Sequence, residues 1–251
     1  MAIDVGQFAV GRTSSGSSQA TSAVNTAASG STFYIFVVWG NGASFTSIAD
    51  SKSNTYNRVG SATFGSMNAR LYECVNGTGG SSHTATLTVS TNESLTVFLV
   101  EVTGGLTAGI VDQSDSREDT TSPFTLAAGL TTTQANELLL SFLAGDSTSN
   151  PATHAESGLG SSSIVIEETN GSAFFPGAIA KSYKTSTGTF NPSWTESGAT
   201  DSGVWLVTLK EAASAPVYGT TVGVDDPQRF ERRRRQRATG MTWSLDTKQW
   251  W

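Results

Sequence analysis

The run Leu95–Val102 constrains the fold most strongly, because nearly all of its residues are β-branched, aromatic or aliphatic. Gly104 and Gly105 end it at the length of a strand. Apolar residues at both alternating positions predict a strand covered on both faces, as at the centre of a sandwich. Phe33–Trp39 and Glu137–Leu143 are similar runs that also end near glycines. We expect interior strands at all three, although periodicity alone also allows a buried helix at each. Length, flanking glycines and β-branched residues favour a strand for the first two runs, and the alternative stays open for Leu138–Leu143.

The composition favours an all-β protein. Glycine occurs 26 times and charged residues make up only 14% of the chain, against roughly a quarter in ordinary soluble domains. Segments that alternate between polar and apolar residues, such as Thr84–Ser90 and Gly203–Lys210, follow one another at short spacing. The predicted fold class is an all-β, antiparallel β-sandwich or jelly roll of about ten to twelve strands. It is formed by residues 1–212 and followed by a C-terminal extension, residues 213–251.

Glycine- and asparagine-rich segments predict how some strands are connected. Asn76–Gly80 is expected to join Arg70–Val75 and Thr84–Ser90 as neighbouring strands. Two polar segments, Ile110–Thr121 and Asp146–Gly160, are expected to be long loops.

The single cysteine, Cys74, excludes an internal disulfide and is expected to be a small core residue. The first residues lack a basic region followed by an apolar stretch, so no signal peptide is predicted. No apolar run approaches the ~20 residues of a membrane helix, so no membrane association is expected. No motif indicates a cofactor.

Several short motifs occur in a fixed order: Asp50-Ser-x-x-Asn54-x-Tyr56, Leu71-Tyr72-x-Cys74, Gly79-Gly80, Thr84-x-Thr86-Leu87-Thr88-Val89, Glu101-x-x-Gly104 and Thr131–Leu138. This order resembles a β-sandwich that is repeated in virion structural proteins of tailed phages, of the decoration and fibre type, and in bacterial surface proteins. The resemblance extends over roughly residues 1–210. It implies a sandwich that belongs to a virion, and it implies no catalytic centre.

The C-terminal extension begins with a predicted linker that ends at Pro216 and continues as residues 217–251, which we call the C-terminal arm. The extension differs in charge from the rest of the chain. Residues 1–212 carry 8 Lys/Arg and 17 Asp/Glu, a net charge of −9, whereas residues 213–251 carry 7 and 4, a net charge of +3; together they give −6. Asp226 is suited to the N-cap, Pro227 to the first position and Gly240 to the C-cap of a short arginine-rich helix.

The arm combines two residue types that are enriched at interface hot spots, tryptophan and arginine. It holds three of the six tryptophans of the chain. We predict that it docks on another virion protein, of the capsid or tail, or on a copy of the same chain. The alternative, in which the arm folds back on its own sandwich, stays open. The predicted docking residues are Phe230, Arg232, Arg233, Arg234, Arg235, Arg237, Trp243, Leu245, Trp250 and Trp251.

The same arginines could neutralise phosphates, and the tryptophans could stack on bases. Because residues 1–212 are strongly acidic and would repel nucleic acid, we favour a protein partner over nucleic acid.

Other residues suggest enzymatic or metal chemistry only weakly. His83 and His154 lack zinc-ligand spacing and no Gly-x-Ser-x-Gly motif is present, so both are expected to be exposed loop histidines. A glycosidase or a calcium site would use acidic residues, but those of this chain are explained most simply as residues of solvated loops and strand ends. These are Asp112, Asp115, Glu118, Asp119, Glu167 and Glu168.

Trp39 and Trp205 lie inside apolar runs and are expected in the core. Trp194 is expected on a loop, where it would be the possible carbohydrate contact. The sequence thus predicts a non-enzymatic virion structural protein, a capsid decoration or cement protein anchored through its arm. The alternatives are a tail or collar fibre, or a carbohydrate-binding receptor module that contacts a host glycan.

Overall fold

The structure is a computed structural model that describes residues 2–64, 66–147, 149–170 and 175–212. Sixteen strands and no helix occur in the described residues. Their bounds are β1 Asp4–Ala20, β2 Ser31–Gly40, β3 Phe45–Asp50, β4 Asn57–Phe64, β5 Met67–Gly77, β6 Ala85–Thr103, β7 Val111–Asp119, β8 Phe124–Thr125, β9 Leu130–Thr131, β10 Glu137–Gly145, β11 His154–Glu156, β12 Ser163–Glu168, β13 Gly177–Lys184, β14 Thr189–Phe190, β15 Ser193–Glu196 and β16 Ser202–Lys210.

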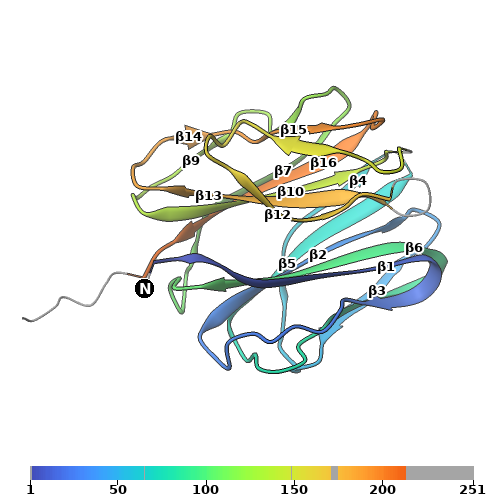
Figure 1. Ribbon diagram of the computed structural model, residues 1–251, viewed down its shortest axis with the longest axis horizontal. Helices are drawn as coiled ribbons and strands as arrows, with labels where there is room; N and C mark the ends of the chain where they lie inside the picture. The colour runs from blue at the N-terminus through green and yellow to red at the C-terminus, as the bar shows by residue number, and fades with distance from the viewer. Residues whose placement is uncertain (1, 65, 148, 171–174, 213–251) are drawn as a thin grey trace, which may run out of the picture. The chain divides into compact units, whose positions relative to one another are not determined.

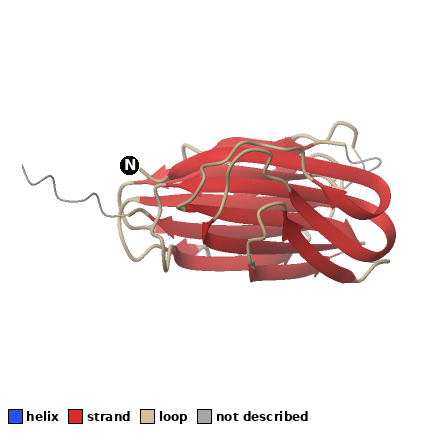
Figure 2. Ribbon diagram, turned by 90° about the horizontal axis from the view of Figure 1, so that it is seen from below, coloured by secondary structure: helices blue, strands red, loops and turns tan. Residues whose placement is uncertain are grey.

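Two large antiparallel sheets form the body (Figure 1). The first has the order β1-β6-β2-β5-β4, with β3 paired to β6 outside this path, and the second has the order β12-β13-β10-β16-β7. Two small sheets, β11-β15-β8 and β14-β9, accompany the second sheet. In the described part of the chain, regular structure is strand only (Figure 2).

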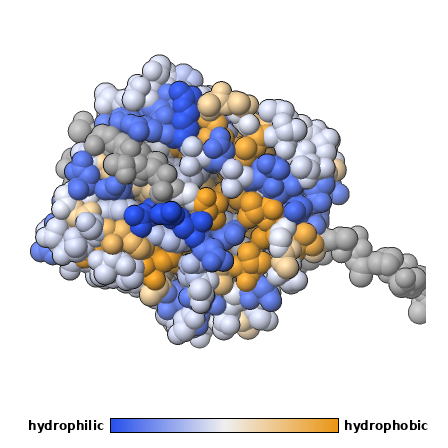
Figure 3. Space-filling model, turned by 180° about the vertical axis from the view of Figure 1, so that it is seen from behind, coloured by the Kyte–Doolittle hydropathy of each residue, from blue (hydrophilic) through white to orange (hydrophobic). Residues whose placement is uncertain are grey.

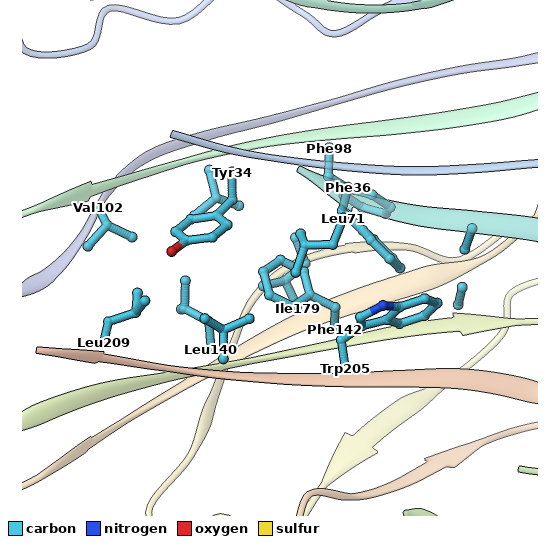
Figure 4. Close-up of a cluster of buried hydrophobic side chains, with 14 of the residues drawn as sticks. Tyr34, Phe36, Leu71, Phe98, Val102, Leu140, Phe142, Ile179, Trp205 and Leu209 are labelled. Carbon is cyan, nitrogen blue, oxygen red and sulfur yellow. The ribbon is translucent and has the colours of Figure 1, made fainter. Parts of the chain in front are cut away.

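The central core lies between the two large sheets, and aromatic rings fill its middle (Figure 4). The ring centroid of Phe36 lies 5.0 Å from that of Trp205, 5.4 Å from that of Phe142 and 6.0 Å from that of Phe98. Phe36 and Phe98 come from the first sheet, whereas Phe142 and Trp205 come from the second. The prediction of an all-β sandwich is therefore confirmed, while jelly-roll connectivity stays a prediction.

Two further cores cover the outer faces of the large sheets. On the first sheet, Ile35 and Val37 pack with Leu87 and Val89, because the first half of β6 lies over this face together with β3. Cys74 belongs to the same core, as predicted. These layers explain why the central strands are apolar on both faces.

On the second sheet, Leu139 and Leu206 pack with Phe124 and Trp194 from the small sheet β11-β15-β8. Because β10 is covered on both faces in this way, its residues read as a continuous apolar run. Glu137–Leu143 is thus a strand and not a buried helix.

Some predicted connections are wrong. Arg70–Val75 does not pair with Thr84–Ser90: β5 pairs with β2 and β4, and Thr84–Ser90 largely continues into Leu95–Val102 as the single strand β6. Ile110–Thr121 is mostly the edge strand β7 and not a loop. Charged side chains suit an edge strand, because they discourage pairing with other chains. The strands beyond the expected ten to twelve are short: β8, β9, β11, β14 and β15.

The predicted linker, the arginine-rich helix and all ten predicted docking residues fall in residues 213–251, outside the described residues.

Candidate functional site

The first candidate is a buried network around His83. Its Nε2 lies 2.9 Å from Asp50 Oδ2, and its Nδ1 lies 3.1 Å from Thr26 Oγ1. These contacts follow the order of a catalytic triad, but His83 has no exposed surface and Thr26 is also buried. The prediction that His83 is an exposed loop residue is therefore wrong. A hydroxyl that no substrate reaches points to a structural role.

Asp50 is the hydrogen-bond acceptor at the centre of this network. Its carboxylate accepts bonds from the backbone N–H of Asn54 (2.9 Å), the Asn54 Nδ2 (2.6 Å) and the Tyr56 hydroxyl (2.8 Å), besides His83. Burial would raise the pKa of Asp50, but the hydrogen bonds from His83 and Asn54 outweigh it and hold the pKa well below its usual range. The motif Asp50–Tyr56 thus forms a clamp that holds the end of β3 against the turn before β6.

The second candidate joins three strands at His154. The imidazole Nδ1 lies 2.9 Å from Glu167 Oε2 on β12, and Nε2 lies 3.4 Å from Glu196 Oε1 on β15. The side chain of His154 is fully buried, so the prediction of an exposed loop histidine is wrong here too. Burial would lower the pKa of His154, but Glu196 and Glu167 outweigh it and raise the pKa. The Nδ1 hydrogen bond to Glu167 and the ion-pair distance between Nε2 and Glu196 tie β11 to β12 and β15.

The third candidate is a carboxyl pair, Asp112 on β7 and Glu137 on β10. Glu137 is fully buried, and burial together with the charge of Asp112 raises the pKa of Glu137 to about 7. Asp112 accepts hydrogen bonds from the backbone N–H and the hydroxyl of Thr133. Asp112 therefore holds the segment before β10 rather than lying in a solvated loop.

We expect Glu137→Gln to stabilise the protein near pH 8 by about 1 kcal/mol, after allowing for solvent screening of the pair. The folded-state pKa of about 7 exceeds the ordinary value of 4.5, so the folded protein holds this proton more tightly than the unfolded one. The stability that the raised pKa of Glu137 contributes is fully present below pH 4.5 and is lost as the pH rises through 7. Urea denaturation at pH 5 and pH 8 measures the effect. Glu118→Gln, at an exposed position of the edge strand β7, is the control. Equal pH dependence of Glu137→Gln and wild type would contradict the expectation.

The carbohydrate contact predicted at Trp194 requires correction. Trp194 lies in β15 and not on a loop, its side chain has no exposed surface, and its Nε1 donates to Ser141 Oγ at 2.7 Å. The ring is buried because the outer face of the second sheet needs an apolar cover. It therefore offers no face to a sugar. Trp39 and Trp205 are buried, as predicted.

The fourth candidate is an open groove of about 310 Å³ between the start of β1 and strands β12 and β13, which we call the β1–β13 groove. Ile3 and Leu138 are buried apolar residues in its lining, and Tyr183 contributes a ring that is 40% exposed. Lys181 Nζ lies 2.6 Å from Asp4 Oδ1 across the groove. No sequence pattern indicates this site, because its residues come from distant segments.

Only the β1–β13 groove among these four candidates combines an exposed aromatic ring with accessible polar groups. In the described residues, no group of three or more His, Cys, Asp or Glu is placed to hold a metal ion. No membrane-spanning helix occurs in the same part of the chain. Comparison with known protein families, with curated proteins and with solved structures finds no match.

Proposed function

We propose that this chain is a non-enzymatic structural protein of a tailed-phage virion, a capsid decoration or cement protein held in place by its C-terminal arm. The observation that carries the proposal is the difference between the apolar cores of the described residues and the composition of the arm. The described residues alone fill three apolar cores. The arm, by contrast, concentrates arginine and tryptophan, the side chains most enriched at interface hot spots.

The buried ionisable groups support a structural role, because they connect strands. Glu101 is a further example: it is buried, and its carboxylate accepts hydrogen bonds from the backbone N–H of Ala27 (2.8 Å), the Ser31 hydroxyl (2.7 Å) and the backbone N–H of Gln7 (3.2 Å). Together with Asp50 it fixes loops to the first sheet. Loops that are tied to a sheet in this way suit a structural protein.

The surface of the body also suits protein contacts. On the face seen from behind, apolar and strongly hydrophilic residues lie next to one another (Figure 3). Protein interfaces have this mixed character, with apolar anchors surrounded by polar groups. Partners of the proposed type are other capsid or tail proteins and copies of this chain.

The proposal is tested in the full chain by replacing Trp243, Trp250 and Trp251 together with alanine. We expect self-association, and addition to capsids that lack the protein, to weaken by at least roughly tenfold, because hot-spot truncations typically cost more than 1.4 kcal/mol. Sedimentation velocity measures the first and co-sedimentation with capsids the second. The same three changes to phenylalanine are the control and should retain part of the binding.

Truncation after Pro216 gives a second test of the arm. The truncated protein should fold but should no longer join the assembly. If the alanine variant and the truncated protein both assemble like the wild type, the arm does not anchor the protein and the proposal is wrong.

A further inference from the structure

The aromatic ring of the β1–β13 groove is held in a fixed position. Tyr183 is 40% exposed, and its hydroxyl donates a hydrogen bond to Glu211 Oε2 at 2.6 Å. Its cross-strand partner is Leu138, which is buried in the central core. Tyr183 and Leu138 lie side by side on the two strands, Leu138 in the central core and Tyr183 at its solvent-exposed edge. The bond to Glu211 limits rotation of the ring, so its apolar face is presented without a large entropic cost on binding.

Serine hydroxyls at the start of β12 and just before it also line the groove. Ser161 and Ser163 are exposed, and within the described residues neither hydroxyl has a hydrogen-bond partner. Ser161 has a φ of 48°, in the left-handed region that non-glycine residues rarely adopt. Such backbone strain is found preferentially at binding sites, where the surrounding structure maintains it. Each free hydroxyl can both donate and accept a hydrogen bond.

The charged groups of the groove balance each other. Lys181 and Asp4 form an ion pair at 2.6 Å, and their side chains are 30% and 58% exposed. Because the ammonium and carboxylate neutralise each other, the pair favours a ligand without net charge. Both groups still have hydrogen-bonding capacity toward a ligand, since an ammonium has three donors and a carboxylate two acceptor oxygens.

We infer that the β1–β13 groove is a binding site for a neutral saccharide. A sugar ring has an apolar C–H face, which packs on an aromatic ring, and hydroxyls at its edge, which pair with serines and with the ion pair. The groove volume of about 310 Å³ lies at the lower end of the range for small-ligand sites. It therefore suits one or two sugar rings rather than a long chain.

The site differs from the one suggested by sequence, because it uses the exposed Tyr183 and not the buried Trp194. It is also independent of the proposed anchoring role, since all of its residues belong to the sandwich. Failure of the saccharide test leaves the arm experiments unaffected, and failure of the arm experiments leaves this site unaffected.

The test is saturation-transfer NMR on the full chain with the methyl glycosides of glucose, galactose, mannose and N-acetylglucosamine as probes. We expect at least one probe to bind with a millimolar Kd. Tyr183→Ala should weaken that binding by roughly tenfold or more. Tyr183→Phe keeps the ring and should retain binding within about threefold.

Two further variants separate the groove from general effects. Phe8→Ala removes a second exposed aromatic ring, 43% exposed and outside the groove lining, and should leave binding unchanged. Ser163→Phe places a bulky side chain in the groove lining and should abolish binding while Tyr183 is still present. Circular dichroism checks that each variant is folded.

Two results would overturn the inference. One is that no probe binds the wild type up to ~10 mM, a weak limit even for small ligands. The other is that folded Tyr183→Ala and Ser163→Phe bind the probes as well as the wild type does, which would place any sugar contact elsewhere.

Discussion

Replacing Trp194 by alanine is expected to destabilise the protein by about 3–5 kcal/mol, the usual cost of truncating a fully buried tryptophan. The indole packs in the core between the second sheet and the small sheet β11-β15-β8, next to Phe124 and Leu206. Its removal leaves a cavity there. It also leaves Ser141 without the N–H donor that now lies 2.7 Å from its hydroxyl. Urea denaturation at neutral pH measures the loss.

Trp194→Phe and Tyr183→Ala are the matched comparisons. Phenylalanine keeps most of the apolar volume but loses the hydrogen bond, so we expect an intermediate cost of roughly 1–2 kcal/mol. Tyr183→Ala, at an exposed ring, should cost less than about 1 kcal/mol. A loss below about 1 kcal/mol for Trp194→Ala would show that this ring does not support the layer that covers the second sheet.

The central strands could be predicted because their information is local. Phe33–Trp39 and Leu95–Val102 are apolar on both faces, and their length, flanking glycines and β-branched residues favour a covered strand over a buried helix. The structure places both in the first sheet, between the central core and a flanking core. The sandwich class follows from such runs together with the many short alternating segments.

Pairings and buried polar sites could not be predicted, because they depend on distant residues. The alternation of Thr84–Ser90 is the same whether the segment turns back on Arg70–Val75 or continues into a longer strand. His83 stands among small polar residues, and its burial depends on Asp50, which is 33 positions away in the chain. Trp194 likewise lies in a polar stretch and is buried only because the second sheet requires a cover.

Replacing Asp50 by alanine is the second change for which we expect a large effect, a loss of about 3–5 kcal/mol. The substitution removes the acceptor for His83, Asn54 and Tyr56. Each donor that stays buried without a partner then costs the free energy of removing it from water, with no hydrogen bond to offset it. The motif Asp50–Tyr56 should then loosen, together with its contact to the start of β6.

The pH dependence gives an independent check on the Asp50 clamp. The pKa of Asp50 is depressed in the folded protein, so its contribution is present above the ordinary value of 3.8 and is lost as the pH falls below it. Wild type should therefore lose stability steeply on acidification, whereas Asp50→Ala should show a shallower decline between pH 5 and pH 2. Asp115→Ala, at an exposed position of β7, is the control and should follow the wild type. Parallel acid profiles for wild type and Asp50→Ala would mean that the carboxylate does not hold this turn in its charged form.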